Sequence, residues 1–128
     1  KPNNFNASYF LFNEKNAIDS KTYKKMENQE YFDYELKTHA SLMKLLNESE
    51  IENEKFLENQ ADKFRFQMLN NLITKLGEDY FAGKTKGIIT QYLDSEIDKI
   101  DFKDSVLFAS NNDYRYFLSS YFVAGLTS

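Results

Sequence analysis

Residues 64–76, FRFQMLNNLITKL, are the stretch that decides the fold. On a helical wheel its apolar side chains cover one half of the circle, whereas polar residues such as Gln67 fill the other half. An apolar arc this wide is broader than the stripe of a surface helix, so it needs other helices on two sides. The stretch therefore predicts a central helix in which Met68, Leu69 and Leu72 are nearly fully buried.

Start and stop signals set the predicted extent of this helix. Ser49 is followed three residues later by Glu52, which is the pattern of a capping box. Gly77 is the residue type that most often ends a helix at the C′ position. These signals predict a central helix over about residues 50–76.

Helical patterns also occur on both sides of the central stretch. The predicted helices comprise a first one over about 6–15 that Asn6 caps, one that Asp19 caps, one over 31–46, one over 88–100, and a last one that Asn111 or Asn112 caps and Gly125 ends. The predicted buried side of the last helix consists of Tyr114, Phe117, Leu118, Tyr121 and Phe122. Together these patterns predict an all-α fold, an irregular bundle of about five to six helices around the central helix.

Two shorter segments join these helices. Gly83 and Gly87 flank three polar residues and predict a turn. Residues 102–109 are short and apolar, and their type is ambiguous from the pattern. Entry through Asp104 fits a buried turn of helix.

Length and composition restrict the class of protein. A chain of 128 residues is long enough for one domain, residues 1–128, with a core of its own. The net charge of −4 and a sequence pI of about 5.0 argue against a nucleic-acid partner. Without cysteine, the segment has no disulfide, thiolate metal site or redox thiol. Its apolar runs, such as 9–12 and 121–124, are far shorter than the roughly 20 residues of a transmembrane helix.

The residues that could carry chemistry fit structural roles better. His39, the only histidine, lies on the apolar stripe of its helix without neighbouring ligands, which favours a helix contact over a catalytic base or a metal ligand. The acidic run over 48–62 could attract cations or a basic partner, but negative charge is also typical of the first turns of a long helix. Asp94, Asp98 and Asp101 lack the Gly and Glu of a calcium loop and fit a solvated face.

No catalytic, cofactor-binding or metal-ligating residue is therefore predicted, and the chain contains neither a P-loop nor a Gly-x-Ser-x-Gly elbow. Three residues are candidates for contact with a partner. Arg65 lies near the centre of the apolar arc, where it either contacts an anion or a partner or pairs with Asp62 or Glu58. Arg115 stands between two tyrosines, one of them Tyr116, which suggests stacking.

One segment resembles a known family. Residues 100–110, IDFKDSVLFAS, followed by 116–121, YFLSSY, are similar to a segment of the helical region that precedes the thioredoxin fold in TlpA-like thioredoxin-family proteins of Bacteroidota. That family often has the phrase D-F-x-D-x-x-L-(L/F)-x-(S/T), with a proline where Ser105 stands here. The resemblance implies an exported protein, periplasmic or an outer-membrane lipoprotein, whose redox Cys-x-x-C lies in another domain. None of the family's catalytic residues has a counterpart in this segment.

These observations lead to two expectations about function. The first is a non-catalytic helical accessory or interaction domain, cut from a longer chain, that contacts a neighbouring domain, another protein or a second copy. As the resemblance implies, its parent would be an exported thioredoxin-like thiol-disulfide oxidoreductase. The alternative is a helical ligand- or peptide-binding module with an aromatic-lined pocket between the central and last helices. An internal cavity would favour the alternative, and a close-packed core with an exposed apolar patch would favour the first.

Overall fold

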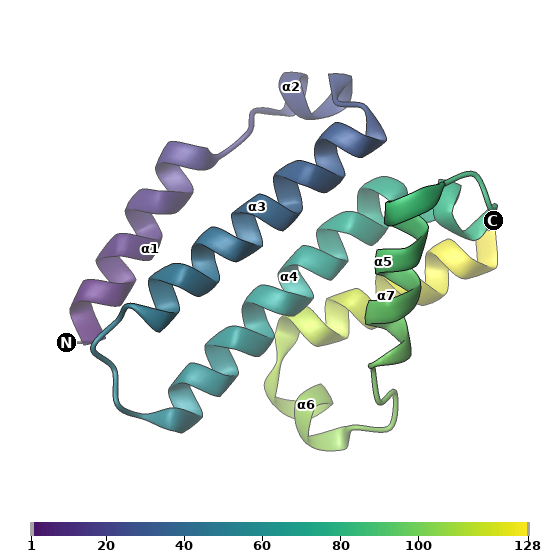
Figure 1. The fold of residues 1–128 in the computed structure, drawn as a ribbon. Helices are drawn as coiled ribbons and strands as arrows, with labels where there is room; N and C mark the ends of the chain where they lie inside the picture. Colours follow the sequence, from purple (N-terminus) through teal and green to yellow (C-terminus); the bar gives the residue numbers. More distant parts are fainter. Residues whose placement is uncertain (1, 128) are drawn as a thin grey trace. The chain divides into compact units, whose positions relative to one another are not determined.

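The computed structural model describes residues 2–127, and the side chains of residues 5–126. The described residues form α-helices and connecting turns without a strand, which confirms the all-α prediction. The helices are α1 (Pro2–Asn16), α2 (Ser20–Lys25), α3 (Asn28–Asn47), α4 (Glu54–Phe81), α5 (Gly87–Asp98), α6 (Ser105–Ser110) and α7 (Asn112–Thr127) (Figure 1).

The chain divides into two compact units, Lys1–Arg65 and Phe66–Ser128. The long helix α4 is continuous and contributes its first turns to unit 1 and its remaining turns to unit 2. Each unit has buried apolar residues of its own. The two units are therefore described one at a time.

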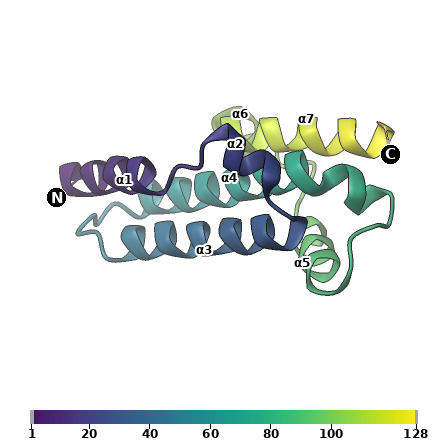
Figure 2. The same cartoon turned by 90° about the horizontal axis from the view of Figure 1, so that it is seen from above.

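Aromatic residues dominate the core of unit 1. Phe5 from α1, Leu42 and Leu46 from α3, and Phe64 from α4 form one buried cluster. The Phe64 ring centroid lies 6.2 Å from that of Phe5 and 5.3 Å from that of Tyr9. Helices α1 and α3 run side by side over this cluster (Figures 1 and 2). Because aromatic side chains bury large areas, a few of them hold three helices together.

Helix α4 begins later than the sequence predicts. Its cap is Asn53, whose side-chain oxygen accepts a hydrogen bond of 3.1 Å from the backbone N–H of Phe56. The Ser49 hydroxyl instead donates to the carbonyl of Leu46, at 2.6 Å, where α3 ends. The predicted capping box of Ser49 and Glu52 is therefore wrong. An asparagine closer to the helix serves the same purpose as a serine.

The C-terminal end of α4 also differs from the prediction. Gly77 does not stop the helix, which continues to Phe81. A Cβ atom on Gly77 would lie 3.2 Å from Cγ2 of Ile73 and 3.3 Å from Cβ of Ala124 in α7. Such distances are too short for ordinary packing, so the glycine permits a close approach of α7. The turn predicted after α4 is confirmed, with φ angles of 74° at Gly83 and 56° at Gly87.

The core of unit 2 is built around the second part of α4. Met68, Leu69 and Leu72 are buried, as predicted. Figure 2 shows α7 on one side of this segment and α5 on the other. The ring of Phe66 lies 4.9 Å from that of Tyr114 and 5.9 Å from that of Phe117, both in α7. Two-sided coverage of the wide apolar arc is therefore confirmed.

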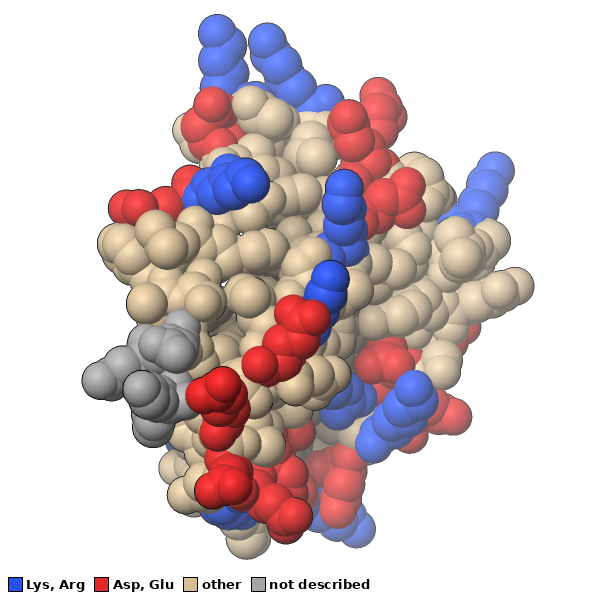
Figure 3. Space-filling model, turned by 60° about the vertical axis from the view of Figure 1, so that its left-hand side comes forward, with Lys and Arg blue, Asp and Glu red and all other residues tan. Residues whose placement is uncertain are grey.

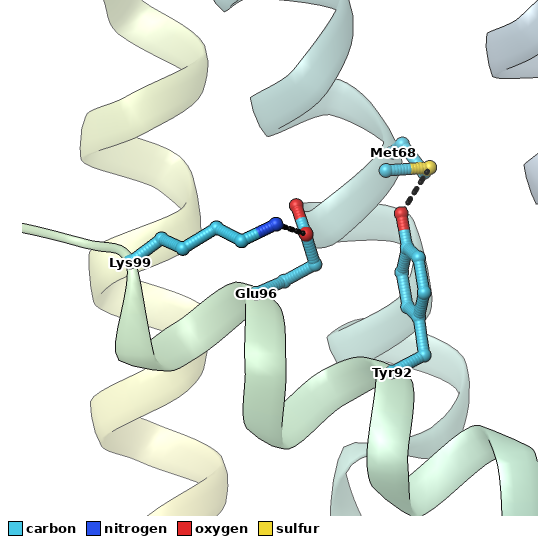
Figure 4. Close-up of polar contacts among 4 residues, drawn as sticks. All are labelled: Met68, Tyr92, Glu96 and Lys99. Carbon is cyan, nitrogen blue, oxygen red and sulfur yellow. Dashed lines mark hydrogen bonds and ion pairs between the residues drawn. The ribbon is translucent and has the colours of Figure 1, made fainter.

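Helix α5 packs against α4 through both apolar and polar contacts. Its buried apolar residues are Ile89 and Leu93. The Tyr92 side chain points from α5 toward α4, and its hydroxyl lies 3.6 Å from the sulfur of Met68 (Figure 4). Near the end of α5, Lys99 forms an ion pair of 2.7 Å with Glu96 (Figure 4). The pair lies three residues apart on one helix face, where opposite charges reinforce the helix modestly.

Side-chain caps fix the starts of three further helices. Asp19 caps α2, Asp104 caps α6 and Asn111 caps α7, each by accepting a hydrogen bond from the backbone N–H three residues later. These three predictions are confirmed. The predicted cap Asn6 is wrong, because it lies inside α1. Gly125 likewise lies inside α7 and does not end it.

Candidate functional site

The most distinctive feature of unit 2 is a set of exposed apolar side chains on and around α6 and α7. We call this set the α6–α7 surface. Its members have exposed fractions from 42% to 86% and comprise Phe102, Val106, Phe108, Tyr116, Phe122, Val123 and Leu126. The prediction that residues 102–109 form a buried turn of helix is wrong in one respect: a helix, α6, begins at Ser105, but none of its residues is buried.

Helix α7 contributes to this surface because it is apolar on more than one side. Its inner face buries Tyr114 and Phe117. At about 100° per residue, Phe122 and Val123 lie on the outer side of the helix. The prediction that Phe122 is buried is therefore wrong, and 55% of it is exposed. Residues 116–127 contain no charged side chain, which is unusual for an outer helix face.

Ring contacts connect the loop before α6 to α7. Phe102 stacks on Tyr121 with ring centroids 5.6 Å apart, and its ring lies 6.2 Å from that of Phe122. Tyr121 in turn contacts the ring of Phe81 in α4, at 5.2 Å. Two exposed rings, those of Phe102 and Phe122, thus contact the half-buried ring of Tyr121. These contacts restrict the positions of both rings in the α6–α7 surface.

Arg115, predicted as a partner contact, makes contacts within unit 2. Its guanidinium donates to the carbonyls of Phe108 and Ala109 and to the side-chain oxygen of Asn112, and it lies 5.9 Å from the Phe108 ring centroid. Carbonyls at the end of a helix lack partners within that helix, so Arg115 completes the end of α6. The ring that it approaches belongs to Phe108 in α6.

The structure places the other two predicted contact residues differently. Tyr116 is 68% exposed and belongs to the α6–α7 surface. Arg65 is half-buried in unit 1 and is the last residue of that unit. Arg115 and Tyr116 are adjacent in α7.

Sequence reasoning missed a buried carboxylate in unit 1. Glu35 on α3 is buried, and its Oε2 accepts a hydrogen bond of 2.8 Å from the hydroxyl of Tyr31. Burial, followed by the nearby Glu35 charge, raises the pKa of Tyr31. The rings of Tyr23 and Tyr31 meet edge to face at 5.3 Å. A tyrosine four residues before a glutamate on one helix face is the signal that could have indicated this pair.

The pair fits a structural role better than a catalytic one. No buried side-chain nitrogen or oxygen among the described residues lacks a hydrogen-bond partner. A buried carboxylate whose hydrogen bonds are satisfied contributes a specific packing arrangement to a helix contact. His39, on the same helix, is half-buried.

Asp94 and Asp98 in α5 and Asp101 in the turn after it are exposed, as a solvated face requires. Asp94 accepts a hydrogen bond from the hydroxyl of Tyr80, and burial together with this carboxylate raises the pKa of Tyr80. Asp101 accepts one of 3.0 Å from the backbone N–H of Lys103. In the described part of the chain, no group of three or more acidic or histidine side chains is placed to hold a metal ion.

A shallow cleft of about 490 Å³ lies between α3 and the start of α4. Its lining residues are Met43, Leu46, Asn47, Ser49, Ile51, Glu54, Leu57, Glu58 and Ala61. None of them is aromatic, and none comes from α7. This cleft therefore differs from the aromatic-lined pocket of the alternative prediction. Two glutamates of the acidic run lie on its wall.

Charge is distributed without a dominant sign on the face that Figure 3 shows. There, Lys and Arg side chains are interspersed with Asp and Glu side chains. Within the described residues, no helix has both the length and the apolar character that a membrane crossing demands.

Comparisons of the chain with protein-family models, with curated proteins and with solved structures find no match. The α6–α7 surface must therefore be interpreted from its own chemistry.

Proposed function

We propose that this chain is a non-catalytic helical interaction domain that binds a protein surface through the α6–α7 surface. One observation carries the proposal, namely the exposure of seven large apolar side chains on two neighbouring segments of unit 2. A fully exposed aromatic residue presents roughly 150–250 Å², and an aliphatic one less. Since the seven residues are exposed by 42–86%, the set presents on the order of 600 Å². The largest apolar patch on a typical soluble monomer covers about 300–600 Å² and is often functional, so this set is at the upper end of that range.

The interior of the domain supports the same function. In both units the helices meet in buried apolar clusters, and the cleft beside α4 is shallow and open. Small-molecule sites usually surround most of their ligand and combine an apolar wall with a few convergent polar groups. The α6–α7 surface instead consists of exposed aromatic and aliphatic side chains. Such side chains are typical of the centre of a protein interface.

The second part of the proposal concerns the longer protein to which this domain belongs. The segment that resembles TlpA-like thioredoxin-family proteins, residues 100–110 and 116–121, includes four members of the α6–α7 surface, Phe102, Val106, Phe108 and Tyr116. On this resemblance we propose an exported parent protein in the periplasm or outer membrane, with a Cys-x-x-C domain elsewhere in the chain. The parental open reading frame tests this part directly. A frame without Cys-x-x-C would remove the thioredoxin link and leave the interaction domain.

Site-specific labelling in the natural polypeptide tests the interaction. The segment has no cysteine, so Val123→Cys introduces a reporter into the α6–α7 surface and Leu11→Cys introduces a matched one into α1. The exposed fractions of the two positions are 57% and 62%. We expect maleimide to label position 123 at least about tenfold more slowly than position 11, because a bound protein covers it. Peptide mass spectrometry separates the two sites from other cysteines, and equal rates would contradict the proposal.

A further inference from the structure

Four exposed residues on the outer face of α7 are spaced symmetrically along the helix. They are Tyr116, Ser119, Val123 and Leu126, at intervals of three, four and three residues, and we call them the seam. This is the spacing of the seam along which two helices pack. Because the order of intervals is symmetric, an antiparallel copy of the same helix presents the same intervals. Tyr116 would then face Leu126 of the copy, and Ser119 would face Val123.

The charge of this face also fits a copy of itself. In a two-fold contact, each side chain near the axis lies close to its own counterpart in the copy, so the two copies of a charged residue there would repel each other. Residues 116–127 contain no Asp, Glu, Lys or Arg, although the whole chain carries a net charge of −4. Ser119, at the centre of the seam, is small and allows the two helices to approach closely. An uncharged seam within an acidic chain is therefore compatible with a second copy.

The available area is sufficient for such a contact. A stable protein interface buries about 800 Å² per partner, of which about 56–65% is apolar. Roughly 450–520 Å² of apolar surface per partner therefore suffices, and the α6–α7 surface offers roughly 600 Å². Phe102 lies beside Phe122 and Phe108 lies beside Arg115. Both α7 residues adjoin the seam on the helical wheel, so the two rings would extend the contact beyond α7.

We propose that the partner of the α6–α7 surface is a second copy of this chain, bound through antiparallel pairing of the two α7 helices about a two-fold axis near residue 121. This inference rests on the proposed function and specifies its partner. Since the seam is uncharged, the dimer should persist at high salt, whereas an association driven by charges would weaken.

The oligomeric state of the chain provides the first test. Sedimentation equilibrium from micromolar to submillimolar concentration should show a monomer–dimer equilibrium. Val123→Glu should raise the dissociation constant by about a hundredfold or more, because each dimer would bury two carboxylates. Leu11→Glu adds the same charge at a comparably exposed site of α1 and should change the constant by no more than about twofold. Circular dichroism confirms that both variants retain their helices.

The second test reads the register of the pairing. Ser119→Cys and Val123→Cys are made in separate chains, which otherwise contain no cysteine. Under mild oxidation, a mixture of the two variants should form inter-chain disulfides faster than either variant alone, because position 119 faces position 123 of the copy. Faster cross-linking of either single variant would contradict the antiparallel register. Comparable cross-linking by Leu11→Cys would contradict specificity altogether.

The two proposals fail in different ways. A chain that remains monomeric at submillimolar concentration overturns the second-copy inference. If position 123 is nevertheless protected in the natural polypeptide, the interaction function stands and its partner is a different protein. If the chain is monomeric and position 123 is fully reactive, both proposals are wrong.

Discussion

The two units have nearly equal length but distribute their apolar residues differently. Among the described residues, unit 1 exposes two large hydrophobic side chains, Phe10 and Leu11, whereas unit 2 exposes eight, namely Ile88, Phe102, Val106, Phe108, Tyr116, Phe122, Val123 and Leu126. Both units nevertheless bury large aromatic residues. The excess in unit 2 is therefore surface beyond what its own core uses. Apolar surface of that size is expected where another protein binds.

The largest expected losses of stability follow from substitutions in the cores of the two units. Phe117→Ala in unit 2 and Phe64→Ala in unit 1 each remove a fully buried ring and should lower the free energy of unfolding by roughly 3–5 kcal/mol. Denaturant melts measure the totals. Native-state hydrogen exchange shows whether each loss is concentrated in its own unit.

An equal loss of protection throughout the chain would show that the units unfold as one body.

Leu72→Ala, at a fully buried position of unit 2, should lower the free energy of unfolding by roughly 2–5 kcal/mol. A loss below about 0.5 kcal/mol would contradict the central role of α4, since surface substitutions have effects of that size.

A second prediction concerns the close contact of α4 and α7 within unit 2. Gly77→Leu should destabilise by roughly 1–3 kcal/mol, because its side chain would collide with Ile73 and Ala124. The control is Glu78→Leu, at the next and exposed position of α4. Thermal melts should separate the two variants clearly. If Gly77→Leu were as stable as the control, the helices would not be packed closely at this point.

The third prediction concerns how the buried hydrogen bond between Tyr31 and Glu35 in unit 1 makes stability depend on pH. Burial and Glu35 raise the pKa of Tyr31 above its ordinary value of 10.0, so the folded state holds this proton more tightly than the unfolded state. The resulting stabilisation is fully present below pH 10 and is lost as the pH rises above it. Tyr31→Phe should lower the free energy of unfolding by roughly 1–3 kcal/mol at neutral pH. The variant should also lose less stability than the unsubstituted chain as the pH rises above 10.

Unfolding experiments at pH values from neutral to alkaline measure both quantities. Tyr80→Phe in unit 2 is the matched variant, since its pKa is raised by burial and by the exposed Asp94. We expect Tyr80→Phe to change the pH dependence of stability less than Tyr31→Phe does, because solvent screens the half-buried pair of Tyr80 and Asp94. A larger effect of Tyr80→Phe would reverse this ranking of the two sites.

The smallest predicted effects compare two helix caps. Asn111 is buried and caps α7, whereas Asn53 is exposed and caps α4. Replacement of either residue by Ala should cost roughly 0.5–2 kcal/mol. The Asn111 variant should lie near the upper end, because water cannot replace the lost partner of a buried N–H. Chemical denaturation of the two variants tests this order, and equal costs would show that burial of the cap is irrelevant.

Local chemistry explains which parts of the fold could be predicted from the sequence. Asp19, Asp104 and Asn111 act as caps through side chains that reach N–H groups three residues away, so short sequence windows contain the signal. Met68 and Leu72 were identified because helical periodicity places them at the centre of the apolar arc. Ser49 and Gly77 were misassigned because their roles depend on neighbouring helices. The carbonyl that Ser49 binds ends α3, and the surface that Gly77 meets belongs to α7.

The candidate site depends even more on tertiary structure. Tyr116 was identified from its place beside Arg115, but the α6–α7 surface as a whole was not. Because α7 is apolar around much of its circumference, periodicity does not indicate which side faces α4. Phe122 was consequently assigned to the core, although more than half of it is exposed. The contact of Arg115 with α6 depends on how the loop between the two helices folds.

The turn between α4 and α5 has a consequence for handling the protein. Gly83 and Gly87 adopt positive φ angles, and the exposed residues Lys84 and Lys86 lie between them. Exposed loop tips of this kind are preferred sites of proteolytic nicking. Trypsin should therefore cut here first. The C-terminal fragment would remain associated, because Tyr92 of α5 contacts Met68 of α4 and the buried ring of Phe117 in α7 contacts Phe66 of α4. The turn thus divides the chain into two complementary fragments, suitable for a split reporter whose reassembly depends on the core of unit 2.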